Sequence, residues 1–354
     1  MNQSTKAEAR PESQPRSLRP IVGLMLGDAT GIGPEVSVKL LALPATHEVA
    51  RVVVVGDARV LELGMVDSGI RLDWRRVDKV ADIDWAASGV PLIDLANVDP
   101  GKFTRGKMSP ESGRLVGETL QHMIRMGKEL DAICFAPLNK AAMKHGGWDY
   151  LDEHQMFAAL TGHKTFFCEM NMIPEFCTFR VTSHMSLRKA LDLITPERIE
   201  GAVRLAHDML VRLGKTPPRI GVAALNPHGG EGGLFGDEEI SIIGPALKRL
   251  NAAGIPCDGP IPSDTVFVKA LAGRYDGVVM MYHDQGQIAT KLIGFSKGIT
   301  VTSGLPQIFT TPAHGTAFDI VGQGKADAGG IEHALRAAAK IALLPPAAAS
   351  RALA

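Results

Sequence analysis

The sequence of 354 residues contains only four cysteines, and no two of them form a C-x-x-C pair. This scarcity argues against both a zinc knuckle and a disulfide framework. No run of about eighteen apolar residues occurs, so the sequence predicts no membrane-spanning helix. The 38 basic residues equal the 38 acidic ones, without the basic excess typical of nucleic-acid-binding surfaces. We therefore expect a cytoplasmic protein that binds neither membranes nor nucleic acid.

Residues 1–19 lack the apolar core that a secretory signal peptide needs. Their content of charged residues, small polar residues and proline predicts a disordered leader. The length of the rest of the chain favours two domains, or one large α/β unit with two lobes.

Apolar, β-branched segments alternate with longer segments of helical periodicity, which predicts an α/β fold of parallel strands joined by helices. The clearest predicted strands are residues 20–26, 49–57, 132–140, 219–230, 276–286 and 298–304. Helices are predicted at residues 33–44, 112–130, 195–215, 237–254 and 331–344. Several strands end in polar residues next to glycine or proline. Because open α/β sheets bind ligands beyond the carboxyl ends of their strands, we expect the site there.

Two histidines follow strand-like segments and are candidate site residues. His228 lies before five glycines between positions 229 and 236, and glycine lets the backbone approach a ligand closely. His184 follows the short strand-like segment 177–182. For each, a structural role stays open as the alternative: a surface turn for His228 and a hydrogen-bonded residue for His184.

A third histidine, His283, follows the apolar segment of residues 276–281 and precedes Asp284 and Gln285. Three adjacent polar side chains at a buried strand exit need partners, which makes a purely structural role harder to sustain. Three imidazoles from separate loops are a usual set of ligands for a catalytic divalent metal. The three histidines therefore form a candidate metal site, provided that the fold brings them together.

Five separated motifs resemble those of the 4-hydroxythreonine-4-phosphate dehydrogenase, or PdxA, family. The likeness extends from about residue 20 to residue 342, with the motifs in the order that the family has. The motifs are LGDATGIGPEV (26–36), ALNPHGGEGGLFGDEE (224–239), GPIPSDTVF (259–267), MYHDQGQIATKLIGF (281–295) and TPAHGTAFDIVGQGKAD (311–327).

The resemblance implies two α/β domains around a cleft, as in the isocitrate and isopropylmalate dehydrogenases. The first domain would comprise residues 20–140 and 305–354. The second, residues 141–304, would carry the interface of a homodimer whose active site uses both subunits.

The family oxidises a secondary hydroxyl of a small β-hydroxy acid with NAD or NADP, in some cases with decarboxylation. One divalent metal polarises that hydroxyl, and zinc, cobalt, manganese and magnesium all stay open here. The family's three metal-binding histidines correspond to His184, His228 and His283, the three already selected from the sequence. A cation bound to the alcohol lowers its pKa and so assists hydride loss.

Several residues that approach the substrate in the family are matched here. The family's two aspartates correspond to Asp264 and Asp284, and its lysine corresponds to Lys291, which implies catalytic roles for all three. Lys291 would also bind an acidic group of the substrate. The histidine of a His-Thr pair, thirty residues before the first metal-binding histidine, corresponds to His154.

Three predicted substrate-binding positions depart from the family. Gln155 replaces the threonine of the His-Thr pair, Thr300 replaces an asparagine, and Phe309 replaces an arginine that grips phosphate. Arginine binds phosphate with charge and two hydrogen bonds, whereas phenylalanine offers neither. The substrate therefore stays open among 4-hydroxythreonine 4-phosphate, phosphorylated four-carbon sugar acids and carboxylated cis-dihydrodiols from aromatic catabolism.

The sequence has no G-x-G-x-x-G motif of the ordinary dinucleotide-binding kind. By resemblance, the dinucleotide would bind near His314, Gly315 and Thr316, and we expect NAD rather than NADP. An alternative of another class is a non-catalytic protein that binds a metal and an organic acid. Retention of all three histidines, both aspartates and Lys291 favours the enzyme.

Overall fold

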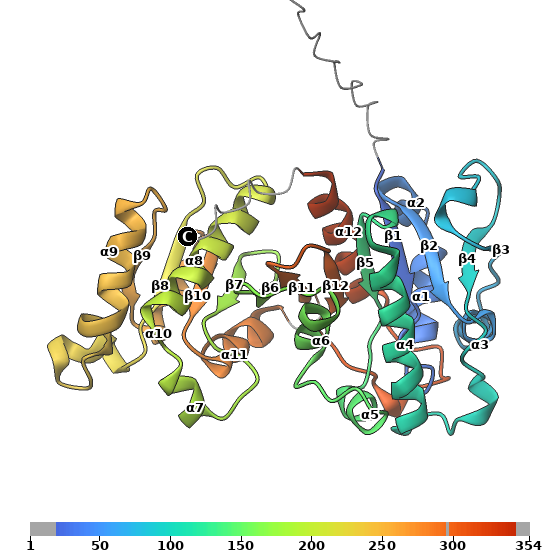
Figure 1. Ribbon diagram of the computed structural model, residues 1–354, viewed down its shortest axis with the longest axis horizontal. Helices are drawn as coiled ribbons and strands as arrows, with labels where there is room; N and C mark the ends of the chain where they lie inside the picture. Colours follow the sequence, from blue (N-terminus) through green and yellow to red (C-terminus); the bar gives the residue numbers. More distant parts are fainter. Residues whose placement is uncertain (1–18, 295–296, 345–354) are drawn as a thin grey trace, which may run out of the picture.

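The computed structural model describes residues 19–294 and 297–344, so all but the last residue of the predicted leader lies outside the described residues. Within that part of the chain, the strands form one twelve-stranded mixed sheet with helices against it (Figure 1). The order of the strands is β3-β4-β2-β1-β5-β12-β11-β6-β7-β10-β8-β9. The predicted α/β class is confirmed.

The strands are β1 Ile21–Met25, β2 Arg51–Gly56, β3 Trp74–Val77, β4 Val90–Asp94, β5 Ala132–Phe135, β6 Cys168–Met172, β7 Cys177–Arg180, β8 Ile220–Ala223, β9 Asp258–Ile261, β10 Gly277–Met280, β11 Ile299–Ser303 and β12 Phe309–Pro312. The α-helices are α1 Gly33–Leu41, α2 Pro44–Val49, α3 Ala58–Ser68, α4 Pro110–Met126, α5 Lys140–His145, α6 Glu153–Leu160, α7 Leu187–Asp192, α8 Pro196–Arg212, α9 Gly244–Ala252, α10 Ser263–Leu271, α11 His283–Gly294 and α12 Gly329–Leu343.

The sheet is parallel at both ends and antiparallel in its centre. At one end of the sheet, neighbouring strands are parallel in the series β3, β4, β2, β1, β5 and β12. At the other end, they are parallel in the series β7, β10, β8 and β9. Between them, β11 is antiparallel to β12 and to β6, and β6 is antiparallel to β7. The prediction of parallel strands is therefore wrong for the centre. Only residues 173–176 connect β6 to β7, and so short a connection joins antiparallel strands.

Burial explains the sequence patterns that predicted these elements. Residues 52–55 of β2 are four consecutive buried valines, as expected of a parallel strand covered on both faces. Helix α8 buries Ile199, Val203, Ala206 and Leu210 at the spacing of one helix face.

The two ends of the sheet come from different parts of the chain. Strands β1 to β5 and β12 make one half, and β6 to β11 make the other (Figure 1). The division into domains of residues 20–140 with 305–354, and 141–304, stays a prediction.

The segment 276–286 is a strand only as far as Met280, and helix α11 begins at His283. The chain turns back sharply here. A Cβ atom on Gly286 would lie 1.4 Å from the sulfur of Met280, so only glycine fits. The side-chain oxygen of Gln285 accepts a hydrogen bond from the backbone nitrogen of Met281 at 2.6 Å. His283 and Asp284 therefore lie in the first turn of a helix.

An ion pair joins Arg219 and Asp276, the residues that directly precede β8 and β10. The nearly buried carboxylate of Asp276 accepts hydrogen bonds from Nε and Nη2 of Arg219, at 3.0 and 2.8 Å, and from the Arg219 backbone nitrogen at 3.0 Å. The hydrogen bond to Arg219 lowers the pKa of Asp276 to about 2. The carboxylate is therefore ionised in the folded protein over most of the acid range.

We expect Asp276→Asn to lower the free energy of unfolding by about 1–3 kcal/mol at pH 7, because Arg219 loses a bidentate partner. The folded pKa is depressed, so this stabilisation is present above the ordinary pKa near 4 and is lost as the pH falls towards 2. Denaturant unfolding of both proteins across pH 2–7 measures this. Asp258→Asn, at the exposed ion pair with Arg274, is the control and should change stability by less than about 1 kcal/mol. An Asp276→Asn effect that stays constant down to pH 2 would contradict the assignment.

Candidate functional site

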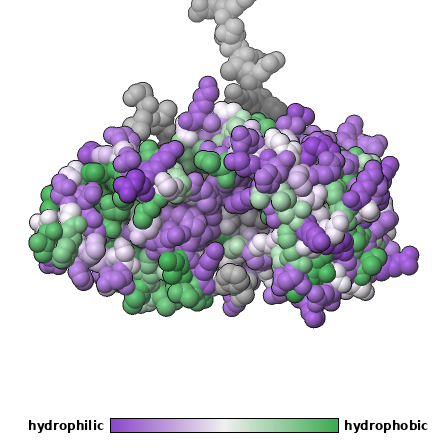
Figure 2. Space-filling model, turned by 90° about the horizontal axis from the view of Figure 1, so that it is seen from below, coloured by the Kyte–Doolittle hydropathy of each residue, from purple (hydrophilic) through white to green (hydrophobic). Residues whose placement is uncertain are grey.

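A polar cavity of about 250 Å³ lies where the two halves of the sheet meet. Its walls come from the ends of β5 and β12, the central strands β6 and β11, and helix α11. Figure 2 shows the molecule hollowed between its two halves, with hydrophilic side chains gathered beside the hollow. Among the predicted site residues, the cavity wall contains His184, His283, Lys291, Thr300, His314 and Gly315.

His184 and His283 lie side by side, with ring centroids 5.3 Å apart. Each ring is held by a carboxylate at Nδ1: His184 by Asp152 at 2.5 Å, and His283 by Asp284 at 2.6 Å. This leaves Nε2 of each ring available for a ligand. A carboxylate on the far nitrogen is the usual support of a metal-binding histidine, so the two rings fit metal ligands.

The pKa values of His283 and Asp152 agree with such a role. Burial lowers the pKa of His283, which favours the neutral imidazole that binds metals. For Asp152, burial opposes ionisation, but the hydrogen bond to His184 and the charge of His154 lower its pKa to about 2.

The third predicted ligand, His228, is not brought to this pair. Its side chain is exposed on the glycine-rich loop after β8, its φ is +54°, and its ring lies 6.4 Å from that of Phe235. Glu239 holds the start of the loop by accepting hydrogen bonds from the backbone nitrogens of Leu225 and Asn226. In the described part of the chain, no three His, Cys, Asp or Glu side chains are arranged to hold a metal ion.

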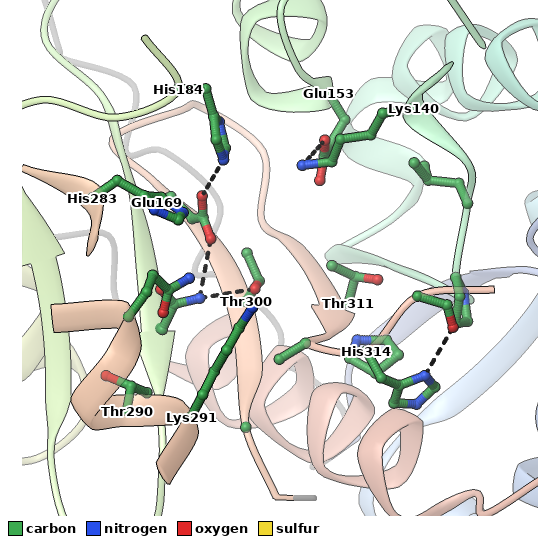
Figure 3. A pocket seen from close by; sticks show the side chains of 18 of the residues that line it. Lys140, Glu153, Glu169, His184, His283, Thr290, Lys291, Thr300, Thr311 and His314 are labelled. Carbon is green, nitrogen blue, oxygen red and sulfur yellow. Dashed lines mark hydrogen bonds and ion pairs between the residues drawn. The ribbon is translucent and has the colours of Figure 1, made fainter. Parts of the chain in front are cut away.

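The predicted catalytic residues are divided between the cavity and the surface. Lys291 lies in the cavity wall and points towards Thr300 (Figure 3). Lys291 forms no ion pair with any residue that the structure describes. Asp284 is 75% exposed beside His283, and Asp264 is exposed in the first turn of α10.

Three predicted substrate-binding residues do not line the cavity. His154 is buried behind it, where its Nδ1 lies 2.6 Å from Oγ1 of Thr302, and Gln155 is exposed. Phe309 is fully buried and stacks on Phe157 with ring centroids 4.1 Å apart. An aromatic ring is stabilised by such apolar contact, so Phe309 belongs to the core in this conformation.

At the other end of the cavity, the predicted cofactor residues are supported by the first strand-helix turn. His314 and Gly315 line the cavity, whereas Thr316 is buried beneath it. The carbonyl of Thr316 accepts a hydrogen bond from the backbone nitrogen of Ile32 at 3.1 Å, and a Cβ atom on Gly31 would lie 2.8 Å from that of Thr316. The glycine at position 31 therefore permits a close approach between two of the sequence motifs.

Sequence reasoning missed three charged or polar residues at the site, Glu153, Glu169 and Asn171. Lys140 and Glu153 form an ion pair of 2.8 Å in the cavity wall, and Glu169 of β6 lies on the wall opposite (Figure 3). Asn171 of β6 also lines the cavity. The available signal was the unusual polarity of β6, CEMNM, because polar side chains on a buried strand need partners.

Two solved dehydrogenases share the fold of this chain. The 4-hydroxythreonine-4-phosphate dehydrogenase of Klebsiella pneumoniae is 37% identical, with a TM-score of 0.81 over 93% of this chain and 99% of that chain. The terephthalate 1,2-cis-dihydrodiol dehydrogenase of Burkholderia xenovorans LB400 is 27% identical, with a TM-score of 0.63 over 91% of this chain and 98% of that chain. The fold is thus that of an α/β oxidoreductase.

The chain belongs to the PdxA family. The family described as "Pyridoxal phosphate biosynthetic protein PdxA" matches residues 48–338. A Pseudomonas aeruginosa protein, named as a candidate 4-hydroxythreonine-4-phosphate dehydrogenase 2, is 43% identical over 327 residues, which cover 91% of this chain and 97% of that protein. A Clostridium botulinum protein, named as a candidate D-threonate 4-phosphate dehydrogenase, is 38% identical over 324 residues, covering 91% and 97%. No described helix is long and apolar enough to cross a membrane.

Proposed function

We propose that the protein is a metal-dependent, NAD(P)-linked dehydrogenase that oxidises a secondary hydroxyl of a small phosphorylated hydroxy acid. Decarboxylation of the product can follow when that product is a β-keto acid. The observation that carries the proposal is the pair of His184 and His283, held at Nδ1 by carboxylates in a cavity that also contains Lys291. The names of the relatives support the phosphorylated substrate class.

His184 and His283 would hold the divalent metal, together with His228 if its loop changes position. A bound divalent cation would lower the pKa of the reacting hydroxyl and stabilise the alkoxide. Lys291 would bind the phosphate or carboxylate of the substrate, since its charge is not engaged by a described acidic group. His314 and Gly315 would contact the dinucleotide, which we propose to be NAD.

A second substrate class, the carboxylated cis-dihydrodiols, is favoured by one observation. Phe309 occupies the position of the family's phosphate-binding arginine and is buried against Phe157. The likeness to the terephthalate dihydrodiol dehydrogenase gives this alternative structural support.

We expect metal-loaded protein to reduce NAD with 4-phospho-D-threonate and not with unphosphorylated D-threonate. Lys291→Met, which removes the charge and keeps the length, should raise KM for the phosphorylated acid by about 10- to 100-fold, since charged hydrogen bonds contribute 1.5–3 kcal/mol. Lys297→Met, at an exposed lysine of the next loop, is the control. Steady-state kinetics of the unchanged protein, Lys291→Met and Lys297→Met measures KM. Oxidation of a carboxylated dihydrodiol alone would favour the second class, and no oxidation of any of these compounds would favour a binding protein.

The metal site makes a separate prediction. We expect His184→Ala and His283→Ala each to reduce the affinity for zinc or manganese by at least about tenfold, because each removes a ligand. Metal content after dialysis, and the shift in melting temperature on adding metal, measure binding without any turnover. His163→Ala, at a half-buried histidine that contacts Thr165 and does not line the cavity, is the control.

The metal affinity of the His228→Ala variant shows whether the glycine-rich loop takes part in metal binding. Metal affinity equal to that of the unchanged protein would exclude His228 as a ligand. Unchanged affinity in the other two variants would refute the site.

We also propose a homodimer whose interface includes α10 and α11. These neighbouring helices expose Val268, Leu271, Ile288 and Leu292, and Leu292 is 82% exposed. An apolar patch of this kind is typical of an interaction surface. Asp264 and Asp284 lie on the same helices, so a partner covering the patch would enclose them as well.

We expect Ile288→Asp with Leu292→Asp to convert the dimer to a monomer, because it places two charges in an apolar interface. Light scattering after size-exclusion chromatography measures the mass. Val66→Asp, at an equally exposed valine of α3, is the control and should leave the dimer intact. A dimer that survives both aspartates would place the interface elsewhere.

A further inference from the structure

A buried ion pair lies directly beneath the cavity. Nη2 of Arg180, on β7, lies 2.8 Å from Oε1 of Glu169, on β6, and Arg180 is fully buried. Removing two charges from water costs free energy that a buried pair does not always recover, and well-packed apolar residues often serve stability equally well. Stability is therefore a weak explanation for this pair, and its position at the cavity suggests a role in binding.

The two oxygens of Glu169 have different surroundings. Oε1 accepts hydrogen bonds from Arg180 and, at 3.1 Å, from Nδ2 of Asn171. Oε2 has no hydrogen-bond partner among the described residues. It lies 3.5 Å from Nε2 of His154 and 3.8 Å from Nε2 of His184. Glu169 is 8% exposed and belongs to the cavity wall, so an acceptor with unused capacity is held there.

The charge of this carboxylate is secured by its neighbours. Nη2 of the buried Arg180 guanidinium lies 2.8 Å from Oε1, and an opposite charge so close favours the ionised carboxylate. An ionised carboxylate accepts hydrogen bonds and cannot donate them. Glu169 thus repels carboxylates and phosphates and attracts donors.

We propose that Oε2 of Glu169 accepts a hydrogen bond from a donor group of the substrate, a hydroxyl or an ammonium, on the carbon next to the one that is oxidised. This rests on the proposed function, which places the reacting hydroxyl at His184 and His283. Because Oε2 lies 3.8 Å from Nε2 of His184, the substituent on the adjacent carbon comes within its reach. Thr300 lies between Glu169 and Lys291 (Figure 3). A substrate whose donor group binds Glu169 therefore extends past Thr300, and its acidic end binds the lysine.

Three acids that share the reacting hydroxyl and the phosphate test this assignment. They carry a hydroxyl (4-phosphothreonate), an ammonium (4-hydroxythreonine 4-phosphate) or hydrogen (3-hydroxy-4-phosphobutanoate) on the adjacent carbon. We expect Glu169→Gln to lower kcat/KM for the two donor-bearing acids by about tenfold or more and to leave the third nearly unchanged. If kcat/KM falls more for the ammonium compound than for the hydroxyl compound, the preferred substrate is an amino acid. If it falls more for the hydroxyl compound, the preferred substrate is a sugar acid.

The matched control is Glu175→Gln, at an exposed glutamate in the turn between β6 and β7, which should change none of the three values. An equal loss for all three acids in Glu169→Gln would show that Glu169 only supports the fold, and would overturn the proposal.

Glu169→Gln leaves Arg180 buried without its charged partner, which can unfold the protein. The double variant Glu169→Gln with Arg180→Met removes both charges, and thermal unfolding confirms which variants are folded. A folded double variant should show the same loss of preference for donor-bearing acids. A double variant that keeps the preference overturns the proposal.

Titration calorimetry with the same three acids separates this inference from the proposed function. If the unchanged protein oxidises none of them, the dehydrogenase assignment fails, but binding still reports on Glu169. Tighter binding of the donor-bearing acids that disappears in the variants supports the inference. Equal binding of all three acids, or no binding of any, refutes it.

Discussion

The antiparallel pairing of β6 with β11 is the constraint on which the site depends. The two strands lie between the parallel parts of the sheet, and the register of their pairing sets Asn171 opposite Thr300 and Glu169 opposite Thr302. Side chains from the two strands then bond across the pairing, as Nδ2 of Asn171 does to Oγ1 of Thr300 at 2.9 Å. A shift of one residue would turn these groups to the other face of the sheet.

Secondary structure was predicted most successfully where the pattern within a single segment is sufficient to specify it. The valines of β2 and the apolar face of α8 specify a buried strand and a packed helix without reference to distant residues. The antiparallel centre was missed because β6 is polar and short. Its polar side chains find partners on other strands: Glu169 accepts a hydrogen bond from Arg180 of β7, and Asn171 donates one to Thr300 of β11.

The candidate site shows the same division. His184, His283, Lys291 and His314 were selected from the sequence, and the fold brings all four to one cavity. His228 was selected by the same reasoning, but its position depends on a glycine-rich loop whose conformation no local pattern determines. Phe309 could be recognised as a departure from the family, whereas its burial against Phe157 depends on packing between β12 and α6.

Glu35, which is fully buried in α1, has a consequence for the order in which the chain folds. One of its oxygens, Oε1, accepts hydrogen bonds from Lys39, at 2.8 Å, and from the backbone nitrogen of Ala326, at 2.9 Å. Strand β12 and helix α12 likewise complete the half-sheet that β1 to β5 begin. During synthesis on the ribosome, this half must therefore wait with one edge of β5 unpaired, and with Glu35 lacking its hydrogen bond from Ala326, until β12 and the segment that follows it have emerged. The other half, made from consecutive strands and helices, can close first and provide a folded surface on which the two ends of the chain assemble.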